Sequence, residues 1–76
     1  MAHNINCKDP LGGWEFHFII CNKEWGYIVR IEEYNMKRFD AADYYRRLAR
    51  NYWVLVDRHD PITHEYIETW DSAKRI

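Results

Sequence analysis

The 76-residue chain contains few cysteines, prolines and glycines, and this scarcity narrows its class. Two cysteines, Cys7 and Cys21, can form at most one disulfide, whereas small secreted domains usually carry several. We therefore expect reduced thiols rather than a disulfide-stabilised extracellular fold. Low-complexity stretches are absent, and 47% hydrophobic with 30% charged residues is typical of a folded chain rather than a disordered one.

Long hydrophobic runs are also missing. Apolar runs such as residues 18–21 are far shorter than the roughly 18 residues that suggest a membrane span. The polar start, Met1-Ala2-His3-Asn4, is not typical of a signal peptide. We expect a cytoplasmic protein that has no membrane partner.

Neither sign of charge dominates, because 11 Lys and Arg face 12 Asp and Glu and the formal net charge is -1. Phosphate binding scales with the cations that a protein offers, so this balance argues against a protein whose main partner is a nucleic-acid backbone. The charges are nevertheless unevenly distributed. Residues 37–50 are mainly basic and residues 57–71 mainly acidic, which predicts a basic end and an acidic end of the fold.

The length predicts one domain, residues 1–76, since pieces of it would fall below the roughly 40 residues that an unaided core needs. Residues 1–13 end in the turn formers Asp9-Pro10-Leu11-Gly12-Gly13, and we interpret them as an extended or loosely packed arm.

Two patterns of hydrophobic spacing alternate along the rest of the chain. Period-two alternation predicts strands, and apolar residues three and four apart, after a potential N-cap at Asp40, predict a helix. The expected elements are strands over 14–21, 27–33, 52–56 and 62–70, a helix over 39–50, and turns over 22–26 and 57–61. The prediction is a small α+β domain of β-β-α-β-β order, an antiparallel sheet with one main helix on one face.

This order divides the sheet into a covered face and an opposite face. Residues expected beneath the helix are Phe16, Phe18, Ile20, Val29, Ile31, Tyr45, Leu48, Val54 and Val56. Residues expected on the opposite face are Ile19, Ile28, Trp53 and Leu55, beside His17 and Arg30. A mixed apolar and charged sheet face is typical of a dimer or partner surface. Coverage of that face by the N-terminal arm or the C-terminal hexapeptide is the alternative.

The histidines do not form a recognisable chemical motif. His17 and Cys21 stand at two ends of one expected strand, roughly 13 Å apart by strand rise, too far to share a metal ion. His59 and His64 flank the second turn, where polar residues serve solvation and local hydrogen bonding. We predict no catalytic residue, no metal site and no cofactor, and leave a role for these two histidines open.

Aromatic residues are abundant, at 17% of the chain. A domain this small buries only about 60% of the surface of its unfolded chain, so several aromatic rings should remain accessible. Trp, Tyr and Arg dominate binding hot spots. The candidate protein-binding residues are Trp25, Tyr44, Arg46, Arg47, Trp53 and Trp70.

These features together favour a non-enzymatic protein-binding module that dimerises or docks onto a larger protein. A short, near-neutral, aromatic-rich chain without a chemical motif is also typical in style of phage or mobile-element accessory proteins. Such proteins inhibit a host complex, and anti-CRISPR proteins are among them. This last step is an analogy of composition and not of sequence.

A small nucleic-acid-binding protein is the alternative. Its candidate contacts lie in the basic segment and are Lys37, Arg38, Arg46, Arg47 and Arg50. Guanidinium groups on one helix can contact phosphates, with Tyr44 as a stacking neighbour. Cations near the end of a helix also complement the helix dipole, and Asp43 can pair with Arg46 or Arg47, which explains most of the pattern without a ligand.

Overall fold

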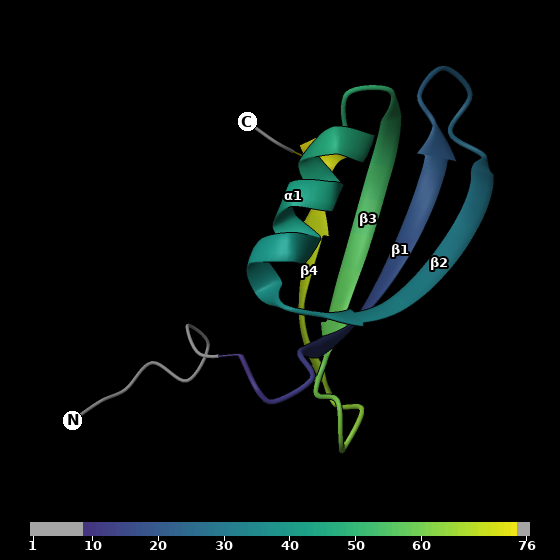
Figure 1. Ribbon diagram of the computed structural model, residues 1–76. Coiled ribbons are helices and arrows are strands. Elements are labelled where there is room, and N and C mark those ends of the chain that lie inside the picture. The colour runs from purple at the N-terminus through teal and green to yellow at the C-terminus, as the bar shows by residue number, and fades with distance from the viewer. Residues whose placement is uncertain (1–8, 75–76) are drawn as a thin grey trace.

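Helix α1 lies against one face of a four-stranded antiparallel sheet in the part of the chain that the structure describes, residues 9–74 (Figure 1). The computed structural model gives the strand order β2-β1-β3-β4. The elements are β1 (Trp14–Asn22), β2 (Ile28–Met36), α1 (Arg38–Leu48), β3 (Tyr52–His59), β4 (Tyr66–Asp71) and the 3-10 turn η2 (Ser72–Lys74). The predicted α+β class and the β-β-α-β-β order are confirmed.

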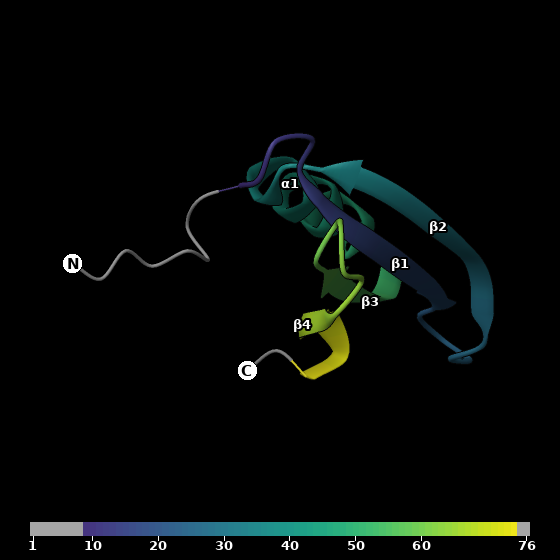
Figure 2. The same ribbon diagram turned by 90° about the horizontal axis from the view of Figure 1, so that it is seen from below.

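Two hairpins make up the sheet, and β1 joins them by pairing antiparallel with both β2 and β3. Strands β1 and β3 are therefore central, while β2 and β4 form the edges of the described sheet. Figures 1 and 2 show α1 on one side of this sheet and no helix on the other side within residues 9–74. No helix in that range is both long and apolar enough to cross a membrane.

The hydrophobic core lies between α1 and the two central strands. Every second residue of a strand shares one face, so β1 and β3 each present alternate apolar side chains to the helix. The buried core residues are Trp14, Phe16, Phe18, Ile20, Ala41, Leu48, Val54 and Val56. The predicted burial of Phe16, Phe18, Ile20, Leu48, Val54 and Val56 is confirmed, and the half-buried Tyr45 packs against the same cluster.

At residues 30 and 31, strand β2 presents its faces the opposite way from the prediction. A register shift between Ile20 and Cys21 pairs Ile28 with Cys21, so Ile28 lies on the face opposite α1, as predicted. Val29 and Ile31, expected beneath the helix, are 43% and 56% exposed. Arg30, expected on the opposite face, lies on the helix side because its partner in β1 is the core residue Ile20. Its Nε lies 2.8 Å from a carboxylate oxygen of Glu32, on the same face. The alternation gives two faces, but the register with β1 decides which of them turns toward α1.

The start of α1 is stabilised from outside the helix. The predicted N-cap at Asp40 is wrong, since the helix begins at Arg38 and Asp40 lies in its first turn. The cap residue, Lys37, makes no side-chain capping bond. Instead, Oδ1 of Asp9 accepts the backbone N–H of Arg38 at 3.0 Å and the indole N–H of Trp14 at 2.9 Å. A carboxylate at this position satisfies a free N–H and complements the positive end of the helix dipole.

The segment before β1 makes a tight turn. The Gly13 N–H donates to the Pro10 carbonyl at 2.9 Å, and Gly13 has φ +81. A Cβ at this glycine would stand 2.4 Å from the carbonyl carbon and oxygen of Met36, so no side chain fits there. Of the predicted arm over residues 1–13, residues 1–8 lie outside the described part of the chain.

The second hairpin differs from its prediction in length. Residues 57–59, expected in the turn, belong to β3, and the turn occupies residues 60–65. After β4, the Ser72 hydroxyl accepts the backbone N–H of Val54 at 2.8 Å. Residues 71–74 thus continue along the edge of β3. Coverage of the second sheet face by the remaining terminal residues lies outside the described part of the chain.

Candidate functional site

The sheet face opposite α1, here called the open face, carries a continuous group of apolar side chains. The antiparallel register places Ile31, Ile19 and Leu55 in one row across β2, β1 and β3. A second row places Ile28, Cys21 and Trp53 beside it. We call these residues the apolar patch: Ile19, Cys21, Ile28, Ile31, Trp53 and Leu55. Side chains directly opposite each other on one sheet face lie within contact distance, so the two rows form one surface.

The apolar patch remains accessible to solvent. Ile28 and Ile31 are each 56% exposed and Trp53 is 40% exposed, while Ile19 and Leu55 at the centre are half-buried. No element within residues 9–74 covers this face (Figure 2). Large aliphatic and aromatic side chains grouped in this way mark a surface where burial against a partner lowers the free energy.

The turn between β1 and β2 extends the apolar patch. Trp25 in this turn is 77% exposed. The turn is ordered by Asn22, whose side-chain oxygen accepts the backbone N–H of Trp25 at 2.7 Å. A Cβ at Gly26 would lie 3.6 Å from the Trp53 ring, so the turn backbone lies directly beside this ring. Trp25 therefore projects from a fixed turn next to the apolar patch.

The other half of the open face is polar and titratable. The rings of His17 and His59 lie 4.8 Å apart, and the carboxylate of Glu15 lies 3.7 Å from His17 and 3.0 Å from Nδ1 of His64. The hydrogen bond between Glu15 and His64 raises the pKa of His64 and lowers the pKa of Glu15. Within residues 9–74, no group of three or more histidines, cysteines and carboxylates is placed to hold a metal ion.

The six residues predicted to bind a protein do not converge on one surface. Trp53 lies on the open face, and Trp25 lies in the turn beside it. Arg46 and Trp70 lie together on the other side of the sheet, in a groove beside α1. Tyr44 and Arg47 belong to neither place.

Tyr44 and Arg47 have internal partners instead. The Tyr44 hydroxyl donates to Glu32 at 2.6 Å and its ring packs edge-on against Phe18 at a centroid distance of 5.1 Å. The hydrogen bond to Glu32 raises the pKa of Tyr44, because it stabilises the protonated phenol. Arg47 lies 3.0 Å from Asp43, one helical turn earlier. Both side chains support the fold at these positions.

The cations predicted for nucleic-acid binding are distributed around α1 rather than along one stripe. Arg38 lies 3.9 Å from Glu68 of β4, and Arg47 pairs with Asp43. The remaining three, Lys37, Arg46 and Arg50, are exposed. Two of the five guanidinium or ammonium groups therefore already face a carboxylate.

Comparison with known proteins assigns no family to this geometry. No family model, curated protein or solved structure matches the chain. A functional assignment therefore depends on the chemistry of the surfaces described here.

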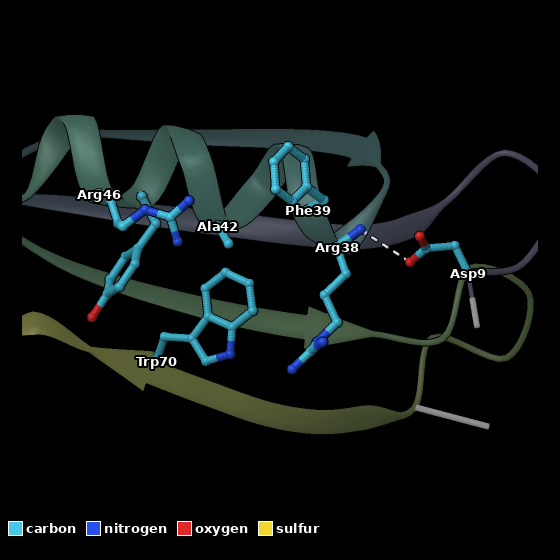
Figure 3. Close-up of a pocket in the computed structure, with 7 residues that line it drawn as sticks. Asp9, Arg38, Phe39, Ala42, Arg46 and Trp70 are labelled. Atoms are coloured by element: carbon cyan, nitrogen blue, oxygen red, sulfur yellow. Dashed lines mark hydrogen bonds between the residues drawn. The ribbon is translucent and has the colours of Figure 1, made fainter. Parts of the chain in front are cut away.

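The groove beside α1 contains residues that the sequence analysis did not single out. It has a volume of about 700 Å³ and runs between α1 and β4 (Figure 3). Its lining residues are Asp9, Arg38, Phe39, Ala42, Tyr45, Arg46 and Trp70. Phe39 is 74% exposed although it lies in the first turn of the helix. Phe39 lies outside the helical spacing of Ala41, Tyr45 and Leu48, which face the core. This position in the sequence was the signal that its aromatic ring would be accessible.

Proposed function

We propose that this protein is a non-enzymatic protein-binding module that docks onto a larger protein through the open face of its sheet. The observation that carries the proposal is the apolar patch, in which Ile28, Ile31 and Trp53 remain 40–56% exposed beside Trp25 at 77%. Helix α1 covers one face of the sheet, and within residues 9–74 no α-helix or strand covers the other face.

The composition of this surface fits a binding hot spot. Two tryptophans stand at its end, and aliphatic side chains exclude water around them, as in the centre of many interfaces. The polar half, with Glu15, His17 and His59, supplies the hydrogen-bonding rim that such interfaces usually have. Burial of apolar area contributes about 25 cal/mol per Å², so a few hundred Å² of patch supplies several kcal/mol toward association.

The wider biological role in this proposal is a cytoplasmic accessory protein that inhibits a host complex, in the style of phage, mobile-element and anti-CRISPR proteins. Its support is the near-neutral, aromatic-rich composition of a short chain. Occlusion of a partner surface needs only a docking face, and the accessible apolar patch supports the open face in this role. A second copy of the chain is the other candidate occupant.

The nucleic-acid alternative has weaker support. Arg46 and Arg50 are exposed and carry no ion pair within residues 9–74, but Arg38 and Arg47 both face carboxylates. The open face adds Glu15, whose carboxylate repels a phosphate backbone.

A paired substitution tests the proposal. Ile31→Lys places a charge in the apolar patch, and Ile62→Lys makes the same change in the turn after β3, where Ile62 is 83% exposed. The wild-type protein and both variants are tagged and used to recover partners from source cells, with and without nuclease treatment. Thermal melts establish that all three are folded, and sedimentation measures self-association.

The proposal predicts one stoichiometric protein that wild type and Ile62→Lys retain and that Ile31→Lys loses by at least about tenfold, because a buried unpaired charge costs several kcal/mol. Recovery that vanishes with nuclease favours the nucleic-acid alternative. A dimer that Ile31→Lys dissociates identifies a second copy as the occupant. Equal retention by both variants contradicts the proposal.

A further inference from the structure

The groove between α1 and β4 is a second surface, on the opposite side of the sheet from the apolar patch. Its floor is aromatic: the Trp70 ring packs at 5.5 Å from Phe16 below it and at 5.5 Å from Tyr45 beside it. Phe39 forms the opposite wall, and Ala42 between them leaves the space open (Figure 3). A groove of about 700 Å³ lies within the 300–1,000 Å³ that ligand sites usually occupy.

Guanidinium groups stand at both ends of this groove. Figure 3 shows Arg38 near one end and Arg46 near the other, with Trp70 between them. An adjoining cavity of about 430 Å³ shares Arg46 and continues to Arg50 and Ser72, so the hollow follows most of the length of α1. Within residues 9–74, neither Arg46 nor Arg50 has an ion-pair partner.

Two carboxylates lie beside the groove, and both have partners within the fold. One oxygen of Asp9 accepts the backbone N–H of Arg38 and the indole N–H of Trp14. Glu68 lies 3.2 Å from the guanidinium of the buried Arg58 and 3.9 Å from that of Arg38. The groove therefore offers an apolar floor with excess positive charge on the α1 side, and its complement is an apolar group flanked by carboxylates.

The shape of the floor favours a peptide over a nucleic acid. Bases bind by stacking on flat, accessible aromatic faces. Here the Trp70 and Tyr45 rings are tilted by 56° and pack against each other, so they form a notch for a side chain rather than a platform.

We propose that this groove binds an extended acidic peptide segment in which one aliphatic or aromatic side chain enters the notch formed by Trp70, Tyr45 and Phe39. The peptide carboxylates on either side of this apolar side chain form ion pairs with Arg46 and Arg50 at one end of the groove. At the other end they approach Arg38. This site is separate from the open face and does not depend on the function proposed for it.

A binding experiment with the full chain tests the site. The probe is a fluorescein-labelled nine-residue peptide of sequence Glu-Asp-Glu-Leu-Phe-Glu-Asp-Leu-Glu, titrated by fluorescence anisotropy at low and high salt. One control peptide replaces its acids by Gln and Asn, and another replaces Leu and Phe by Ser. The expected dissociation constant is about 100 µM, typical of a short peptide on a shallow site.

Variants on the two sides of α1 locate the bound peptide. Arg46→Gln is expected to weaken binding about fivefold through loss of a charge-assisted contact, and the matched Arg47→Gln, on the Asp43 side, leaves it unchanged. Ala42→Leu keeps the helix propensity and fills the notch, so it is expected to abolish binding even if the charge variants perturb the fold. In NMR spectra the indole N–H of Trp70 shifts with peptide, while that of Trp53 does not.

Three results overturn the proposal: no anisotropy change up to 1 mM peptide, equal binding of the peptide without carboxylates, or equal loss in Arg46→Gln and Arg47→Gln. Binding of a fluorescein-labelled oligothymidine that competes with the peptide and is lost in Ala42→Leu assigns the groove to nucleic acid instead. Retention of binding in Ile31→Lys is expected, so failure at this site and failure of the open-face function are distinguishable.

Discussion

Both faces of the sheet carry large apolar side chains, but these side chains differ in how far they are buried. On the covered face, Phe16, Phe18 and Ile20 are fully buried beneath α1. On the open face, Ile31 and Trp53 lie in an equally continuous group but stay 56% and 40% exposed. The covered face holds the fold together, because its central side chains are buried within the chain. On the open face much apolar surface stays accessible, and under the proposed function a partner buries it.

Truncation of the core should give the largest contrast between these faces. Phe18→Ala removes a fully buried ring and is expected to cost about 3–5 kcal/mol of unfolding free energy, a large share of a small domain's total. Ile31→Ala on the open face is expected to cost less than about 1 kcal/mol. Urea denaturation measures both. Similar losses for the two variants would show that the open face is part of the folding core.

Gly13, which lies against Met36 just before β1, should give the next largest effect on stability. Gly13→Ala combines a positive φ with a contact of 2.4 Å to Met36, and it is expected to cost about 3 kcal/mol. Gly12→Ala has a similar φ of +86 but open space around the Cβ, so about 1 kcal/mol is expected. The difference between the two melts isolates the steric part. An equal loss in both would contradict the packing of Gly13 on β2.

The anchoring of the covering helix should show a smaller effect. Asp9→Ala removes the acceptor for the Arg38 N–H and for the Trp14 indole, and a loss of about 1–2 kcal/mol is expected. Asp40→Ala, in the first turn but without the capping bond, is expected to lose about 0.5 kcal/mol through the helix dipole. Chemical denaturation of both variants checks the order. A larger loss for Asp40→Ala would restore it as the N-cap.

The polar half of the open face should give the smallest effect, and it depends on pH. Because the pKa of His64 is raised in the folded protein, its contact with Glu15 contributes its full stability at pH values below the ordinary histidine pKa of 6.5. This contribution is lost as the pH rises through the raised pKa. The lowered pKa of Glu15 contributes above its ordinary value of 4.5, and this is lost as pH falls through the lowered value. The pair therefore contributes most between about pH 4.5 and 6.5, where both groups are charged.

An NMR titration of the histidine rings tests this pair. Glu15→Gln should bring the pKa of His64 back toward its ordinary value, whereas Glu65→Gln, next to His64 in sequence, should leave it raised. An unchanged His64 pKa in Glu15→Gln would show that the contact does not persist in solution.

From the sequence, the two central strands were placed with the correct side inward. Phe16, Phe18 and Ile20 share one face of β1, and Val54 and Val56 share one face of β3, although the other faces of both strands also carry apolar residues. Hairpin order and helix position followed from the turn residues and the helical spacing.

The errors lie where long-range pairing decides the outcome. In β2, both faces hold apolar residues, and only the pairing of Arg30 with Ile20 and of Ile31 with Ile19 shows which face is covered. Arg30 and Glu32 are two residues apart, so they share one strand face and can neutralise each other's charge there. This spacing was a signal that the sequence offered for the orientation of β2. The cap from Asp9 joins residues 29 apart, and no local pattern announces it. The groove likewise depends on α1 and β4 meeting, so Phe39 and Trp70 could not be joined from the sequence.

Site-specific photo-crosslinking tests the docking function of the open face most directly. A benzophenone amino acid replaces Ile31 in one protein and Ile62 in another, and both are irradiated in source cells. The account predicts one discrete crosslinked protein from position 31 and none from position 62, because the partner covers the apolar patch and not the turn. Equal crosslinks from both positions, or none from position 31, would contradict it.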